Sequence, residues 1–393
     1  MIQKKIPAVF MRGGTSKAIV FKQADLPEDR ALWDDIFLAA IGSPDPNGRQ
    51  LNGMGGGISS LSKICIVGPP TRDDADIDFT FGQVAIGQGD TGKGQVGYNA
   101  NCGNMSSAMG PFAVDESLVT ADGDEALVRI HNTNTQKIIH ARFALDDGLA
   151  AVDGDFDLPG VSGTGAPVKM EFRDPGGAGT GKLLPTGNVI DEIDVAGMGT
   201  VEASLVDAAN PCVFVEATAL GLTGTEGPAD IDAMADVMAR LEDIRAQAAV
   251  MMGLAKTPAK ATKETPTIPF VGILGGPQDA KTLSAETIKA ADGDLTARIV
   301  SNGNTHRALP LTGALCLATA SRIDGTVAHR YARAPKSAED DVRLMQPSGI
   351  LPVSCSVVNF NGDWVAEYAG VYRTQRRLFE GNVLVPASRV KGS

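Results

Sequence analysis

The sequence predicts a mixed α/β protein, and three observations lead to this prediction. The 393 residues include 46 glycines and 22 prolines without a low-complexity tract, which is typical of many short strands joined by tight turns. Apolar runs alternate with Gly/Asp turns, and stretches with helical spacing of apolar residues occur between them. The hydrophobic content of 43% is enough for a substantial core, and the length favours two or three domains.

The first half of the chain begins with a predicted strand, turn and strand. Residues 6–21 read IPAVFMRGGTSKAIVF, in which the polar turn RGGTSK separates two apolar runs. A helix is expected at residues 28–41, where apolar residues recur at helical spacing until Gly-Ser-Pro ends the pattern. Further strands are expected at SKICIVG, IDFTFGQVAI and EALVRIHNT, which are residues 62–68, 77–86 and 125–133.

The second half contains the longest amphipathic stretch, residues 231–254, which we interpret as a surface helix packed on a sheet. Before it, residues 174–188 contain GGAGTGK. A phosphate-binding loop has a hydroxyl after its lysine, but Leu183 stands there. We therefore interpret this segment as a turn-rich approach to a second domain.

A weak internal repeat suggests two similar halves. Residues 201–218 resemble a second strand-turn-strand, and an Asn-Gly-rich loop in each half leads into a small-residue segment, MSSAMGPFA or TGALCLATA, expected to be a buried helix. The expected domains are residues 1–186, with 374–393 returning to the first, and residues 187–373. A cleft between two such halves is a common place for a small-molecule site.

Composition excludes several classes of partner. The net charge of −12, with no basic run, argues against nucleic acid and anionic membranes. No apolar stretch reaches the roughly 20 residues of a membrane span, and the N-terminal segment does not resemble a signal peptide. We expect a cytoplasmic protein, for which a homodimer is the candidate assembly.

The cysteines and histidines predict neither a disulfide framework nor a metal site. The five cysteines are scattered without a CxxC pair, and the four histidines form no HExxH motif. One of the thiols could nevertheless be catalytic.

Cys102 is the first candidate for chemistry. It lies in NCGN, and if Gly103 and Asn104 open a helix, free amides and the helix dipole would favour a thiolate or bind a substrate anion. The alternative is a turn cysteine that merely fits a small space.

Lys63 is the second candidate. It follows GMGGGISSLS, whose glycine amides and serine hydroxyls could surround a carboxylate. A lysine that opens an apolar strand is easily desolvated, which favours the neutral amine that can act as a base. The alternative is a solvated lysine at a strand end.

Two polar loops offer groups for binding carboxylates. In RGGTSK, Arg12 could hold a carboxylate with its guanidinium fork, whereas Lys17 offers only a point charge. Asn302, His306 and Arg307 offer similar groups in the second half. The alternative for both loops is a polar turn whose side chains only satisfy backbone groups.

Three ordered motifs carry a family resemblance. RGGTSK, GRQLNGMGGGISSLSK, and NCGN followed by GPFA resemble the signature of the PrpF family, and NGNTHRALPLTGALC and RTQRRLFEGNVLVP extend the resemblance over nearly the whole chain. The resemblance implies a diaminopimelate-epimerase-like fold of two α/β domains. Each would be a barrel-like sheet around a central helix, with the active site between them.

The resemblance also implies an activity. The family shifts a double bond in an aconitate-, methylaconitate-, oxalomesaconate- or methylitaconate-like acid by moving a proton, without cofactor or metal. By motif position, Lys63 and Cys102 correspond to its catalytic residues, and we expect Lys63 to take the proton and Cys102 to return it. The expected substrate-binding residues are Arg12, Thr15, Ser16, Gly56, Ser59, Ser60, Asn101, Gly103, Asn104, Asn302, His306, Arg307, Thr312, Gly313 and Ala314.

Two alternatives remain open at this point. An epimerase or racemase acting at an α-carbon would need a second proton donor facing Cys102, but Cys316 lies inside its predicted helix rather than at the loop. A carboxylate-binding accessory protein would use the same groups without turnover.

Overall fold

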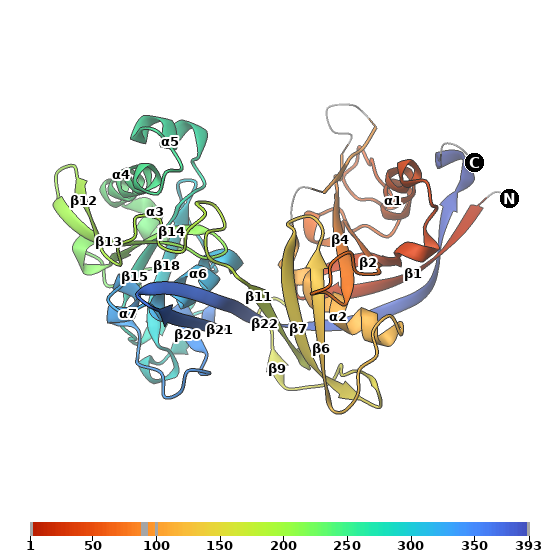
Figure 1. Cartoon of the computed structure of the whole chain (residues 1–393). Helices are drawn as coiled ribbons and strands as arrows, with labels where there is room; N and C mark the ends of the chain where they lie inside the picture. Colours follow the sequence, from red (N-terminus) through yellow and green to blue (C-terminus); the bar gives the residue numbers. More distant parts are fainter. Residues whose placement is uncertain (1–2, 88–92, 99–100, 391–393) are drawn as a thin grey trace. The chain divides into compact units, whose positions relative to one another are not determined.

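The computed structural model describes residues 3–87, 93–98 and 101–390. Within these ranges, strand pairing links 18 strands into one large, mostly antiparallel sheet, which confirms the mixed α/β class. Figure 1 labels the main helices and strands. The chain divides into two compact units. Unit 1 comprises Met1–Met170 and Tyr372–Ser393, and unit 2 comprises Glu171–Val371.

Unit 1 begins with the predicted strand-turn-strand. Strands β1 and β2 pair antiparallel, β3 joins β2 in parallel, β4 pairs antiparallel with β3, β6 joins β4 in parallel, and β7 completes the order antiparallel to β6. The bounds are β1 Gln3–Gly13, β2 Ser16–Lys22, α1 Trp33–Ile41, β3 Lys63–Gly68, β4 Ile77–Val84, β5 Val96–Gly97, α2 Gly103–Asp115, β6 Glu125–Asn132, β7 Lys137–Asp146 and β8 Leu149–Ala150.

Unit 2 repeats this order of strands and helices. Strands β13 and β14 pair antiparallel, β15 joins β14 in parallel, β18 is antiparallel to β15, β20 is parallel to β18, and β21 is antiparallel to β20. The bounds are β12 Asp191–Val195, β13 Gly199–Asp207, β14 Pro211–Glu216, α3 Pro228–Ala233, α4 Ala235–Met251, α5 Pro258–Glu264, β15 Phe270–Gly275, β18 Leu295–Ser301, β19 Asn304–Thr305, α6 Leu311–Ser321, α7 Val327–Tyr331, β20 Val342–Gln346 and β21 Gly349–Phe360.

Two strands cross the boundary between the units along the chain. β11, Pro167–Arg173, carries the chain from unit 1 into unit 2, and β22, Asp363–Pro386, brings it back. The last part of β22 pairs antiparallel with β1.

Each unit has one buried helix made of small residues, as the two segments MSSAMGPFA and TGALCLATA predict. In unit 1, α2 packs against β1, β2, β3, β6, β7 and β8; in unit 2, α6 packs against β13, β14, β20 and β21. A Cβ on Gly110 of α2 would lie 2.9 Å from the Cβ of Ala141 on β7. Small side chains therefore allow the helix to lie close to the sheet.

Two predicted helices have different bounds in the structure. The helix expected at residues 28–41 begins at Trp33, after a 3₁₀ turn at Arg30–Leu32. The stretch 231–254 is not one helix, because Met234 has a non-helical ψ of 80° and separates α3 from α4. Asp232 of α3 accepts a hydrogen bond from the amide of Thr305 on β19. This bond attaches α3 to β19 independently of α4.

The glycine-rich loop at residues 174–188 surrounds a carboxylate of the protein itself. Asp207 is fully buried, and its Oδ2 accepts hydrogen bonds from the amides of Gly179 and Thr180 at 2.8 and 2.7 Å. These are the amides that a phosphate would need. The loop is therefore built around Asp207.

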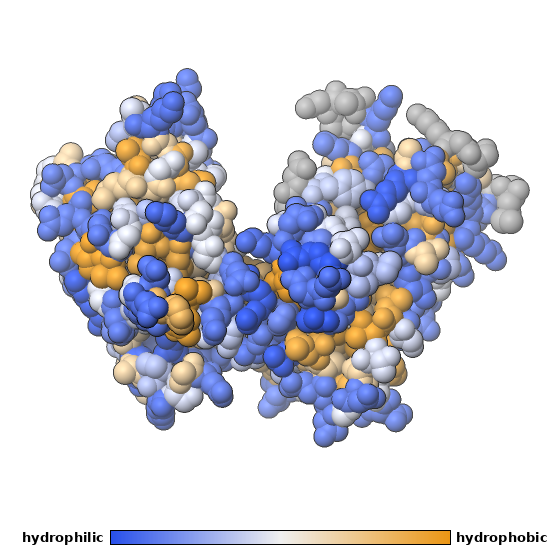
Figure 2. All heavy atoms as spheres, in the orientation of Figure 1, coloured by the Kyte–Doolittle hydropathy of each residue, from blue (hydrophilic) through white to orange (hydrophobic). Residues whose placement is uncertain are grey.

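None of the helices within the described residues is both long and apolar enough to cross a bilayer. Most of the face drawn in Figure 2 is hydrophilic, with smaller apolar areas between charged residues.

Candidate active site

Lys63 is buried at the start of β3, with 8% of its surface exposed. Its Nζ donates a hydrogen bond of 2.6 Å to Oε1 of Gln83, the residue paired with it on β4. The ammonium group also lies 5.0 Å from the ring centroid of Phe81. The amine is thus held at one place in a largely desolvated setting.

Gln83 is a candidate functional residue that none of the sequence motifs contains. Its Nε2 donates to the carbonyl oxygens of Ser59 and Ser62 at 3.1 and 2.9 Å, which leaves Oε1 to face the lysine. The pairing of β3 with β4 would have placed it opposite Lys63, but the sequence alone does not give that register.

The glycine-rich loop before Lys63 is organised by a second glutamine that was missed. Gln50 is fully buried; its Nε2 donates to Ser43 Oγ, and its Oε1 accepts from the amide of Gly57 and from Ser62 Oγ. These bonds fix the loop that leads to Lys63. A buried amide with several partners is well placed to hold a loop that has few side chains.

The predicted loop residues lie along this segment. A Cβ on Gly56 would lie 2.5 Å from Cδ1 of Leu61, so the chain passes too close for a larger residue. Ser59 and Ser60 begin the 3₁₀ turn Ser59–Leu61, with Ser59 exposed and Ser60 half-buried. Neither hydroxyl bonds to a described residue, so both remain available to a ligand.

Cys102 is the N-cap residue of α2, as NCGN predicts. Its thiol makes no capping hydrogen bond, so the first amides of the helix, beginning at Gly103, stay available to an anion. Its carbonyl accepts a hydrogen bond of 2.9 Å from the amide of Ser106. Cys102 is half-buried, whereas the other four cysteines are buried.

Asn101 helps to hold this turn. Its Oδ1 accepts from Nδ2 of the buried Asn132 at 3.1 Å and lies 3.2 Å from Ser106 Oγ. The side chain is therefore engaged with the protein at its oxygen, and its Nδ2 makes no hydrogen bond within the described residues.

A second cysteine, Cys65, has a pKa that depends on both Lys63 and Cys102. Cys65 follows Lys63 on β3 and is fully buried. Burial raises the pKa of the Cys65 thiol well above its ordinary value, the Cys102 sulfur raises it further, and the Lys63 ammonium opposes both. The charges of both candidate catalytic groups therefore influence the protonation of Cys65.

Asn104, in the first turn of α2, joins two polar segments of unit 1. Its Nδ2 donates to Thr15 Oγ1 at 3.1 Å, and its Oδ1 accepts from Nε of Arg373 at 3.1 Å. A Cβ on Gly14, which has φ +51°, would lie 2.3 Å from that Oδ1. The glycines of RGGTSK thus allow the turn to pack on the start of α2.

Arg373 is a third functional candidate that its local sequence does not single out. Its Nη1 donates to the carbonyl of Tyr372 at 2.8 Å, and burial lowers its pKa. Its Nη2 makes no hydrogen bond within the described residues. The only sequence signal was the closing motif RTQRRL, which the structure places beside NCGN through Asn104.

Arg12 and Ser16 lie at the same turn. Nη1 of Arg12 donates to the carbonyl of Gly14 and to both oxygens of Thr374 at 2.9 to 3.0 Å. Burial, and then the charge of Arg376, lower the pKa of Arg12. This nitrogen holds the turn to β22, and Ser16 is buried at the start of β2.

The candidates of the second half form a separate group within unit 2. Asn302 and Arg307 are exposed, and Asn302 has φ 50°. His306 is half-buried; its Nε2 lies 2.7 Å from Ser301 Oγ, and burial lowers its pKa. Thr312, Gly313 and Ala314 form the first turn of α6, where a Cβ on Gly313 would lie 2.8 Å from Ile299.

The repeated strand order shows which groups unit 2 lacks. Phe270 opens β15 as Lys63 opens β3, and Pro310 is the N-cap of α6 as Cys102 is the N-cap of α2. Cys316 is buried within α6 and donates to the carbonyl of Val206. The amine and the thiol therefore both belong to unit 1.

The described residues contain no group of three or more His, Cys, Asp or Glu side chains arranged to hold a metal ion.

Comparison with known proteins agrees with the expected resemblance. The family model described as PrpF protein matches residues 3–386. The chain belongs to the PrpF family. This confirms the resemblance suggested by RGGTSK and NCGN.

Several PrpF-family relatives match over their full length. The chain is 42% identical to 3-methylitaconate isomerase of Eubacterium barkeri, over 99% of each chain. It is 39% identical to 2-methyl-aconitate isomerase of Cupriavidus necator, over 98% of each. The crystal structure of methylitaconate-delta-isomerase superposes with a TM-score of 0.92 at 42% identity, covering 100% of this chain and 98% of that one.

Proposed function

We propose that this PrpF-family protein is a cofactor-independent isomerase that shifts a double bond in a small unsaturated di- or tricarboxylate. The observation that carries the proposal is the full-length similarity to isomerases named for methylitaconate and methylaconitate. A desolvated amine and a half-exposed thiol in unit 1 supply groups for proton transfer.

The proposed mechanism moves one proton. Lys63, as the neutral amine, removes a proton from the carbon next to the alkene and carboxylate, and the electron pair spreads into a dienolate. Amides at the start of α2 stabilise the negative charge that develops on the carboxylate. Cys102 gives a proton to the other end of the allylic system, and the two groups then exchange protons with water to restore their starting states.

Substrate binding is proposed to use groups around the same turn. Arg373 and Arg12 would attract the carboxylates, Thr15 and Asn104 would hydrogen-bond to them, and the loop at Gly56–Ser60 would enclose one end. Asn302, His306, Arg307 and the first turn of α6, all in unit 2, are proposed as further substrate-binding groups. Each unit is proposed to be a barrel-like sheet around its buried helix, as in a diaminopimelate-epimerase-like fold.

An epimerase that acts at an α-carbon would need a second proton donor facing Cys102. No thiol stands at the N-cap of α6, where Pro310 is found, so the unit 2 helix offers no counterpart to Cys102. A cytoplasmic location and a homodimer complete the proposal, and light scattering of the purified protein tests the latter.

Proton NMR in D₂O tests the function. The protein is incubated with methylitaconate, methylaconitate, oxalomesaconate and, as a saturated control, succinate. We expect at least one unsaturated acid to show a moved alkene signal with deuterium uptake. If none of them reacts and binding alone is detected by calorimetry, the protein is a carboxylate-binding accessory protein instead.

A further inference from the structure

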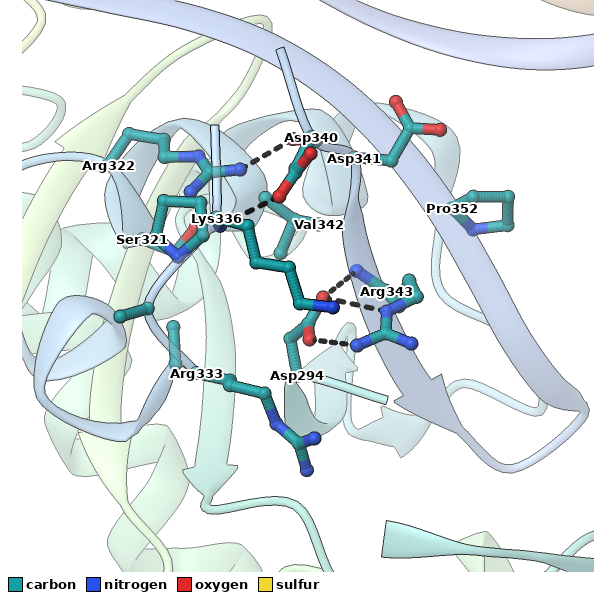
Figure 3. A pocket seen from close by; sticks show the side chains of 13 residues that line it. Asp294, Ser321, Arg322, Arg333, Lys336, Asp340, Asp341, Val342, Arg343 and Pro352 are labelled. Atoms are coloured by element: carbon teal, nitrogen blue, oxygen red, sulfur yellow. Dashed lines mark hydrogen bonds and ion pairs between the residues drawn. The ribbon is translucent and has the colours of Figure 1, made fainter. Parts of the chain in front are cut away.

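We propose that unit 2 carries a second anion site, suited to a small di- or tricarboxylate, formed by Arg322, Arg333 and Lys336. A cavity of about 380 Å³ lies at the end of α6, beside residues 332–336 and the first residues of β20. It shares no residue with the candidate active site. Figure 3 shows the basic side chains around this space.

The lining carries more positive than negative charge, although the whole chain has a net charge of −12. Four basic and three acidic side chains line the cavity, which gives a formal excess of one positive charge. The basic residues are Arg322, Arg333, Lys336 and Arg343, and the acidic residues are Asp294, Asp340 and Asp341.

Two of the carboxylates are already committed to the protein. Asp294 accepts from Nη2, Nε and the amide of Arg343 at 2.7, 3.2 and 2.8 Å, so this pair neutralises itself. Oδ2 of Asp340 accepts from the amides of Lys336 and Ser337 at 2.7 and 3.1 Å. These carboxylates therefore bond to the loop and to Arg343, and not to the other three basic side chains.

The other three cations have no carboxylate partner within the described residues. The guanidinium of Arg322 donates only to the carbonyl of Asp340 at 2.6 Å, and the guanidinium of Arg333 only to the carbonyl of Ala290 at 2.8 Å. The ammonium group of Lys336 makes no hydrogen bond to a described side chain. Their charges are therefore available to a ligand.

Arg322 supplies an independent observation. Its Nε is buried and has no hydrogen-bond partner. A buried donor without a partner is costly, more so when it belongs to a charged group. An anion that reached this Nε would relieve the cost.

The arrangement favours an anion with separated charges. The three cations come from the C-cap of α6 and from two positions in the loop that follows α7. A guanidinium binds a carboxylate through two parallel hydrogen bonds, and an ammonium adds a point charge. A di- or tricarboxylate offers several charged groups to such cations, whereas a single phosphate offers one charged centre.

Calorimetry with citrate and, separately, inorganic phosphate tests the site. Because citrate could also occupy the candidate active site, Arg373→Gln is the background in which binding is measured. We expect citrate to bind this background, and the added pair Arg333→Gln and Lys336→Gln to weaken binding at least tenfold. The added pair Lys260→Gln and Lys263→Gln, on α5, removes the same charge elsewhere in unit 2 and should change binding less than twofold.

The outcomes separate the possibilities. Unchanged citrate affinity in the Arg333/Lys336 variant, equal loss in the α5 control, or absence of citrate binding to the background would each overturn the proposal. Binding of phosphate but not citrate would overturn the assignment to polycarboxylates. Circular dichroism of each variant establishes that lost binding is not lost folding, and a pocket variant that fails to fold is replaced by Lys336→Gln alone.

Discussion

Nζ of Lys63 donates a 2.6 Å hydrogen bond to Oε1 of Gln83, its partner across the β3–β4 pair. The amide of Gln83 is oriented in turn by the carbonyls of Ser59 and Ser62. Gln83 is therefore a positioning residue in this account. It sets where the amine of Lys63 lies without supplying a proton itself.

Replacing Gln83 with Leu should lower kcat about tenfold, equivalent to about 1.4 kcal/mol, and change KM less than twofold. Leu has a similar size but no acceptor, so the lysine loses its fixed position. Gln83→Glu keeps an acceptor and should retain more activity than the Leu variant. Equal kcat loss in both, or a change confined to KM, would refute the positioning role; steady-state kinetics provides the measurement.

Gln50 should matter more for stability than for binding. Gln50→Ala leaves Ser43, Ser62 and the amide of Gly57 without their buried partner, so the free energy of unfolding should fall by about 1–3 kcal/mol. Urea denaturation measures this change. Gln136→Ala, at an exposed position, serves as the control and should stay within about 0.5 kcal/mol of wild type.

Cys102 should be the thiol that reacts first in the folded protein. It is half-buried, and the other four cysteines are buried. Brief treatment with iodoacetamide should therefore add one group, at Cys102, as read by mass spectrometry of peptides. Cys102→Ser should remain unmodified under the same conditions, and labelling of Cys65 or Cys316 at a similar rate would contradict the burial pattern.

Glu116 should make stability depend on pH. Burial opposes ionisation of this carboxyl, but hydrogen bonds from Arg377 and Lys22 and their charges lower its pKa below the ordinary 4.5. Because the folded state holds the proton less tightly than the unfolded state, this stabilisation is present above pH 4.5 and disappears as pH falls through the folded-state pKa.

Glu116→Gln should accordingly lower the free energy of unfolding by about 1–3 kcal/mol at pH 7. The difference from wild type should narrow as the pH falls below 4.5, in urea titrations at several pH values. Glu380→Gln removes a carboxylate that also bonds Arg377 but is 70% exposed, and it should have a much smaller effect. A difference for Glu116→Gln that does not depend on pH would be inconsistent with this linkage.

Local patterns in the sequence predicted much of the fold. The alternation of apolar runs and turns gave β1, β2, β3, β4 and β6, and the small-residue segments gave α2 and α6. The pattern at 231–254 did not reveal the break at Met234, because apolar spacing continues across it while the backbone does not. Helical periodicity reports which residues face the core, not where the chain leaves helical geometry.

The sequence predicts a residue of the candidate site only when that residue lies within a recognisable motif. Lys63 and Cys102 stand out because a glycine-rich loop or a helix start surrounds each of them. Gln83 contacts Lys63 because the register of β3 and β4 pairs the two residues. Arg373 contacts Asn104, which lies 269 residues earlier in the chain. Such contacts depend on tertiary structure, so no local pattern indicates them.

Deuterium exchange into methylitaconate, followed by proton NMR in D₂O, tests the proposed proton transfer most directly. Wild type is compared with Lys63→Arg, which keeps a long basic side chain but whose guanidinium does not lose its proton to act as a base, and with Cys102→Ser. The account predicts that both variants remain folded and lose at least a hundredfold in isomerisation. Isomerisation within tenfold of wild type in either folded variant would contradict it.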